Sequence, residues 1–173
     1  AGGRQANTTA GFSIIDYTGT GSAGTVSHGL GAVPHVIIVK NRSTGTDGEW
    51  NVYHHKNTGA PETDFLILND TTATQDAANR WNDTAPTSSV FTIGDTVRVN
   101  EDADNYIAYC WTSIQGYSKF GSYQGNANAD GPFIYTGFKP AFVITKPNEA
   151  GGNWNGNDSA RDPVNPLDNR LRL

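Results

Sequence analysis

The sequence predicts an all-β fold, an antiparallel β-sandwich of jelly-roll type, and three observations lead to this prediction. Short apolar segments recur along the 173 residues and are separated by turns rich in glycine, serine, threonine and asparagine. Glycine occurs 20 times, methionine is absent and aromatic residues reach 10%, which suits many short strands joined by tight turns. One passage of the chain also occurs twice, which indicates a duplicated strand–loop–strand unit.

The first copy of this passage covers residues 11–40 and the second covers residues 116–146. Gly-Phe-Ser at 11–13 matches Gly-Tyr-Ser at 116–118, and Pro-x-Val-Ile-Ile-x-Lys at 34–40 matches Pro-x-Phe-Val-Ile-x-Lys at 140–146. Farther along, Trp154 corresponds to Trp50, and residues 171–173 correspond to residues 66–68. Residues 69–113 have no counterpart, so the second copy is incomplete.

Taken in order, the chain begins with small and polar residues 1–10, which we expect to be a flexible arm. A single domain of residues 11–173 follows. Strands are predicted at residues 12–17, 25–28, 35–40, 49–54, 65–68, 88–93, 96–100 and 105–113. Residues 72–81 are the one helix candidate, with a capping-box pattern but almost no apolar stripe.

Two of these strands are expected to build the core. Residues 35–40 are a continuous apolar run, which predicts a central strand buried on both faces. Residues 105–113 alternate, so that Tyr106, Ala108 and Cys110 share one face of their strand. We therefore expect Cys110 to be a small core residue rather than a nucleophile.

Charge and hydropathy exclude several classes of protein. The net charge is −5 and basic residues form no run, which argues against a nucleic-acid partner. No segment approaches the roughly 18 apolar residues of a membrane helix, so we expect a soluble protein. The single cysteine excludes an internal disulfide. The chain begins at Ala1 without a signal peptide, and we expect it to be processed or part of a longer product.

No catalytic constellation is recognisable, and we predict neither an enzyme nor a cofactor. The chain has no Gly-x-Ser-x-Gly elbow, phosphate loop or dinucleotide fingerprint. The adjacent His54 and His55 are expected to point to opposite faces of a strand end, where they cannot hold one metal together. Glu101, Asp102 and Asp104 crowd one turn and offer oxygens suited to Ca²⁺. Solvated turn acids are the simpler interpretation.

Carbohydrate is the one small-molecule ligand that the residues suggest. Aromatic side chains stack on sugar rings, and Trp81 in its polar, asparagine-rich surroundings is the best candidate, with Tyr53 as a second. Trp50, Trp111 and Trp154 are more simply explained as core residues. Five Asn-x-Ser/Thr sequons are candidate glycosylation sites, and several would arise by chance in this composition; they are Asn7, Asn41, Asn69, Asn82 and Asn157.

The incomplete second copy predicts self-assembly. One and a half repeats leave a sheet edge without its neighbour, and natural proteins seldom leave a long edge bare. A strand from another copy can fill such a gap. We expect either the arm of residues 1–10 or the end at residues 171–173 to supply it in a head-to-tail filament. The candidate contacts are Phe12, Ile14, Ile15, Leu171 and Leu173.

Several motifs resemble a domain found in tail-associated proteins of tailed phages, notably those of aquatic hosts. They include Thr-Val-Ser-His-Gly-Leu-Gly-Ala-Val-Pro at 25–34, Tyr-Ile-Ala-Tyr-Cys-Trp at 106–111 and Asp-Gly-Pro-Phe-x-Tyr-Thr-Gly-Phe-x-Pro-Ala at 130–141. The resemblance covers nearly all of residues 11–172. It implies an extracellular or virion-borne structural subunit or adhesive module without catalytic residues. The alternative is a lectin-like module that recognises host-surface sugars, and a polysaccharide depolymerase ranks third.

Overall fold

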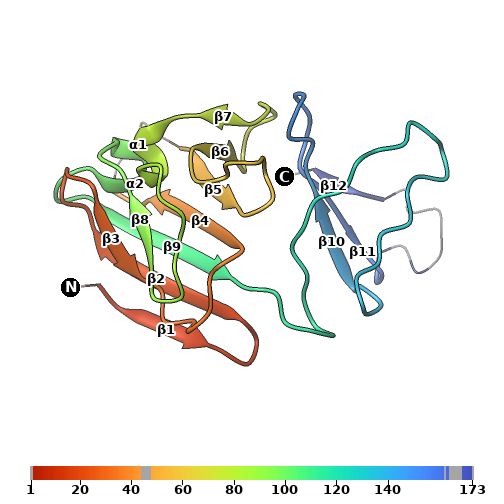
Figure 1. The fold of residues 1–173 in the computed structure, drawn as a ribbon, viewed down its shortest axis with the longest axis horizontal. Coiled ribbons are helices and arrows are strands. Elements are labelled where there is room, and N and C mark those ends of the chain that lie inside the picture. Colours follow the sequence, from red (N-terminus) through yellow and green to blue (C-terminus); the bar gives the residue numbers. More distant parts are fainter. Residues whose placement is uncertain (1, 44–47, 162, 164–168, 173) are drawn as a thin grey trace.

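The computed structural model describes residues 2–43, 48–161, 163 and 169–172. Within them the protein is almost entirely β (Figure 1), which confirms the predicted fold class. Seven strands form one antiparallel sheet in the order β1-β2-β9-β4-β5-β6-β7. Their bounds are β1 (Arg4–Asn7), β2 (Phe12–Thr18), β9 (Asn105–Trp111), β4 (Val36–Asn41), β5 (Trp50–His54), β6 (Asp64–Ile67) and β7 (Gln75–Asp76).

The centre of this sheet is built from the two strands whose patterns were the clearest. β4 lies between β9 and β5, and its apolar residues are covered on both faces, as the continuous apolar run predicts. In β9, Tyr106, Ala108 and Cys110 are fully buried on one face. Burial raises the pKa of the Cys110 thiol to about 12, so this cysteine is a core residue.

A smaller layer covers one face of the sheet. It consists of the two-stranded ladder of β3 (Gly24–Ser27) and β8 (Val90–Ile93), with two helical turns, α1 (Ala78–Trp81) and α2 (Val97–Asn100). Val26, Phe91, Ile93, Trp81 and Val99 from this layer are buried against the sheet in one cluster. Because this layer has two strands among the described residues, the sandwich and jelly-roll details of the prediction are not confirmed.

The expected flexible arm forms a strand. β1 pairs with β2 from Arg4 opposite Ile15 to Asn7 opposite Phe12. The Arg4 side chain also donates a hydrogen bond from Nη1 to Ser27 Oγ at 2.5 Å. The expectation of a free arm is therefore wrong for the described residues 2–10. Their polar composition is misleading because both faces of an edge strand can remain in water.

Two further predicted elements differ from the structure. Residues 96–100 alternate as a strand would, but Val97–Asn100 form the helical turn α2. Tertiary contacts hold this turn: Tyr106 Oη donates to Val97 O at 2.5 Å and Tyr17 Oη donates to Val99 O at 2.7 Å. Of the predicted helix at residues 72–81, only Ala78–Trp81 is helical, because β7 occupies the first half.

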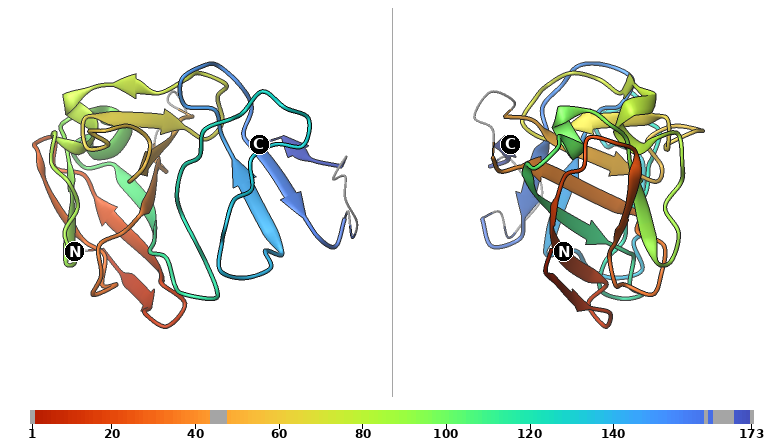
Figure 2. Two further views of the ribbon diagram at one scale, coloured as in Figure 1. Left: turned by 45° about the vertical axis from the view of Figure 1, so that its right-hand side comes forward. Right: turned by 90° about the vertical axis from the view of Figure 1, so that its left-hand side faces the viewer.

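The second copy of the duplicated unit, in the last third of the chain, repeats the β4-β5-β6 meander in a separate sheet. Its strands are β10 (Phe142–Thr145), β11 (Asn155–Asp158) and β12 (Leu171–Arg172), in that order. Phe142 lies opposite Asp158, as the equivalent Val36 lies opposite His54. The β11–β12 pairing likewise has the register of β5–β6. Figure 2 shows this sheet standing beside the larger one.

Glycine conformations are repeated as well. Gly11 and its counterpart Gly116 have φ values of 63° and 76°, and Gly29 and Gly137 have values of 73° and 86°. Such angles favour glycine, because a side chain would strain the backbone. The duplication is thus visible in loop geometry as well as in strand register. No helix among the described residues has the length and apolar character to cross a membrane.

Candidate functional site

The residues predicted for strand exchange are largely unavailable. Phe12, Ile14 and Ile15 belong to β2, which pairs with β1 on one side and with β9 on the other. Their backbone cannot join a neighbour unless the sheet opens, so this part of the prediction is wrong. Leu171 lies on the exposed strand β12, and Leu173 lies outside the described residues.

The residues predicted for glycan contact are buried. Trp81 is 2% exposed, and its Nε1 donates a hydrogen bond to Asp64 O at 3.1 Å. Tyr53 is also buried, and the two rings meet edge to face with centroids 6.0 Å apart. Polar neighbours in the sequence suggested an exposed indole, but α1 turns it into the core. Both residues are therefore excluded as sugar contacts in the folded protein.

The five sequons differ in solvent exposure. Asn7, Asn69 and Asn82 are exposed, and Asn157 is half-buried in β11. Asn41 is buried, and its Nδ2 donates to Asp104 Oδ2 at 2.8 Å and to Tyr106 Oη at 2.9 Å. A glycan cannot be attached to this amide without breaking those contacts, so Asn41 is wrong as a glycosylation site.

The acidic turn and the histidines do not assemble a metal site. The part of the chain that the structure describes contains no group of three or more His, Cys, Asp or Glu placed to hold an ion. His54 and His55 do not point to opposite faces as expected, because β5 ends between them and their ring centroids are 5.4 Å apart. His35 joins them, with its ring centroid 4.2 Å from that of His55.

These histidines are expected to make the stability of the fold depend on pH. Burial, followed by the nearby His55 and His35, lowers the pKa of His54 from 6.5 to about 4. The unfolded chain therefore binds more protons than the folded chain between these two values, and stability should fall as pH drops through this window. We expect urea midpoints to decrease as pH falls from about 6.5 to about 4. His54→Gln should flatten the decrease, and an unchanged slope would contradict the assignment.

The second sheet is the largest departure from a closed fold. Phe142 is 51% exposed where the equivalent Val36 is 8% exposed, and Val143 is 41% exposed where Ile37 is 1% exposed. In the first copy β9 pairs with β4, and β8, α1 and α2 help to cover it, whereas the described residues hold no counterparts of these elements for β10. β10 has β11 as its one neighbour among the described strands.

Exposed apolar side chains gather in the last third of the chain, which contains the second sheet. Nine of the eleven large hydrophobic side chains that are exposed among the described residues follow residue 113, so the apolar surface of the part before residue 113 is largely covered and that of the last third is not. They include Tyr117, Tyr123, Phe133, Tyr135 and Ile144. Exposed apolar surface that gathers in one region marks an interaction site more often than scattered residues do.

A hydrogen-bonded seam joins the two sheets. Lys146, at the end of β10, donates from Nζ to the carbonyl oxygens of Thr71, Thr72 and Gly152 at 3.1, 2.8 and 2.7 Å. Trp154 donates from Nε1 to Ile67 O at 2.8 Å. The indole also packs against the apolar cluster on the outer face of the larger sheet. These contacts hold the second sheet in place.

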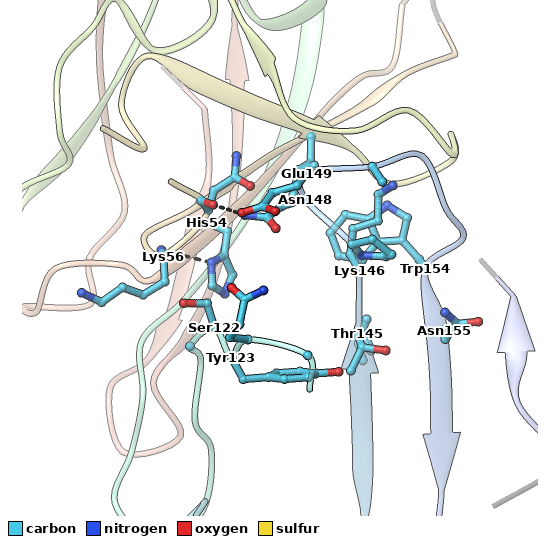
Figure 3. Close-up of a pocket in the computed structure, with 18 residues that line it drawn as sticks. His54, Lys56, Ser122, Tyr123, Thr145, Lys146, Asn148, Glu149, Trp154 and Asn155 are labelled. Atoms are coloured by element: carbon cyan, nitrogen blue, oxygen red, sulfur yellow. Dashed lines mark hydrogen bonds between the residues drawn. The ribbon is translucent and has the colours of Figure 1, made fainter. Parts of the chain in front are cut away.

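A cleft of about 500 Å³ opens beside this seam. Figure 3 shows His54 and Ser122 on one side, Thr145, Lys146 and Trp154 on the other, and Tyr123 and Glu149 at opposite ends. The walls come from β5, the loop at residues 121–125, β10 and the segment leading to β11. Sequence reasoning missed this cleft, because its walls are distant in sequence. The only signal was the polar and aromatic composition of residues 121–125.

Comparison with known proteins places the chain in a family. A domain of unknown function, DUF7483, matches residues 3–173. No curated protein and no solved structure matches the chain. The match extends over both copies of the duplicated unit, including β10, β11 and β12. The chain therefore belongs to the DUF7483 family.

Proposed function

We propose that this protein is a non-enzymatic structural subunit or adhesive module of a phage tail or extracellular fibre that works as an assembly of identical chains. The observation that carries the proposal is the open strand β10. Its register repeats that of β4, but the edge at which β4 receives β9 has no neighbour among the described strands. Backbone groups along such an edge are free to pair with another strand.

A second β10 is the partner that fits best. The strand reads Phe-Val-Ile-Thr and carries no charge. At the equivalent edge of the first copy, β4 pairs with β9, which is also largely apolar. By contrast, β1, the four-residue strand at one edge of the seven-stranded sheet, is polar and contains Arg4. Charged side chains are a common protection of sheet edges. Two β10 strands related by a twofold axis would pair without a buried charge and would cover each other's apolar side chains.

Twofold pairing of β10 replaces the head-to-tail filament that the sequence predicted. A head-to-tail filament through residues 1–10 would require β1 to leave β2 or to accept β10 at its polar edge. Twofold pairing leaves the first half of each chain intact. A fibre role then requires the dimer to be one element of a larger particle, which agrees with the resemblance to tail-associated domains.

Val143→Lys tests the proposal. Val143 lies in the middle of β10, is exposed, and does not line the cleft. We expect size-exclusion chromatography with light scattering to show a dimer for the parent chain and a monomer for the variant, because lysine opposes edge pairing. Val33→Lys is the matched control, since Val33 is similarly exposed but lies outside β10, in the segment between β3 and β4. A parent chain that stays monomeric, or a variant that stays dimeric, would overturn the proposal.

A further inference from the structure

The cleft between the two sheets has the chemistry of a carbohydrate site, and we infer that it binds a short, neutral glycan. This site does not require a second copy, because all of its walls come from one chain. It shares Ile144 and Thr145 with β10, the strand proposed to pair. Its volume of about 500 Å³ lies within the usual range for small-molecule sites. Three features of the lining favour a sugar.

The first feature is a buried donor without a partner. Asn57 lines the cleft and is 4% exposed. Its backbone N–H donates to His54 O at 2.9 Å, its backbone oxygen accepts from Asn148 Nδ2, and its Oδ1 accepts from Thr74 Oγ1 at 2.7 Å. Only Nδ2 has no partner in the described part of the chain. An unpaired buried donor is costly. Because this nitrogen is itself buried behind the cleft surface, a ligand hydroxyl can satisfy it only after the wall around Asn57 adjusts.

The second feature is an amphipathic lining. The ring of Tyr123 is exposed at one end of the cleft (Figure 3), and Leu66 and Ile144 contribute apolar surface. Ser122, Gln124 and Asn155 add neutral hydrogen-bonding groups. A sugar ring presents a C–H face and a rim of hydroxyl groups. Such a ligand matches an aromatic surface bordered by amides and hydroxyls.

The third feature is the balance of charge. Lys146 already donates to three backbone carbonyls, so its ammonium group is committed to the seam. Lys56 and Glu149, of opposite sign, both line the cleft. The pKa of His54 is lowered to about 4, so its imidazole is neutral near pH 7. Two lysines and one glutamate give the lining a formal charge of +1. Because the three hydrogens of the Lys146 ammonium are donated to carbonyls and Lys56 is offset by Glu149, most groups that can meet a ligand are neutral, which favours a polyol over a phosphate or carboxylate.

Saturation-transfer NMR with an equimolar mixture of methyl glycosides of glucose, galactose, mannose and N-acetylglucosamine tests this inference. We expect signal transfer to at least one glycoside. For the best binder, Tyr123→Ala should raise the dissociation constant about tenfold or more, because it removes the aromatic surface. Tyr123→Phe keeps the ring and should retain most of the affinity. Tyr135→Ala removes a similarly exposed ring outside the cleft and should change nothing.

The outcomes are distinct from those of the assembly experiment. The saturation-transfer NMR experiment is repeated on the Val143→Lys protein, so that sugar binding is measured with and without β10 pairing. Absence of transfer to every glycoside in both proteins, or equal binding by Tyr123→Ala and the parent chain, would overturn the carbohydrate site. Neither result would bear on the oligomeric state. Circular dichroism of each variant shows whether the fold is retained.

Discussion

Replacing Trp81 with alanine is expected to lower the free energy of unfolding by about 3–5 kcal/mol. The indole is one of the largest fully buried side chains, and it packs in the cluster that joins the seven-stranded sheet to its smaller layer. Alanine would leave a cavity there and would remove the donor to Asp64 O. Both changes destabilise the folded state. Urea unfolding followed by circular dichroism measures the loss.

Phe133→Ala is the matched control for this experiment. Phe133 is 90% exposed, so its truncation should change the unfolding free energy by less than about 0.5 kcal/mol. Comparable losses in the two variants would contradict the burial of Trp81. The result also affects how glycan binding is studied. A Trp81→Ala protein that fails to bind sugar would report a damaged core, whereas Tyr123→Ala tests a contact on the wall of the cleft.

The sequence was most informative where a pattern depends on a single strand. The apolar run at residues 35–40 can be satisfied only by a strand covered on both faces, and β4 is such a strand. Alternation at residues 105–113 indicated which face of β9 is buried, and Tyr106 and Cys110 are both on it. The sequence duplication also predicted strand pairing. Matching Trp154 to Trp50 aligns the residues paired in β10–β11 with those paired in β4–β5.

Elements determined by distant contacts were not predictable. Residues 96–100 have the alternation of a strand, yet hydrogen bonds from Tyr17 and Tyr106 to backbone carbonyls hold them as the turn α2. Trp81 lies among polar residues, but its burial is determined by Tyr53 and the rest of the core. Tertiary context overrides local propensity in both cases. The same reasoning explains why the cleft was missed, since its walls meet only after both sheets have formed.

A double cysteine variant, Val143→Cys with Ile144→Cys, is expected to form a disulfide-linked dimer under mild oxidation. Both residues lie in the middle of β10. In a twofold antiparallel pairing centred on this strand, residue 143 of one copy lies opposite residue 143 or 144 of the other copy, or residue 144 lies opposite residue 144. Paired Cβ atoms in such a ladder are about 4.5–5.5 Å apart, close to the separation that a disulfide needs. The native Cys110 is buried and should not react.

Ala32→Cys with Val33→Cys is the matched control, because these adjacent residues are also exposed but lie in the loop between β3 and β4 rather than in β10. On non-reducing gels we expect a discrete dimer for the β10 variant and mainly monomer for the control. A ladder of higher oligomers through β10 would instead indicate open, head-to-tail contacts. If both variants cross-linked equally, the disulfide would reflect random collision, and the twofold pairing of β10 would have to be abandoned.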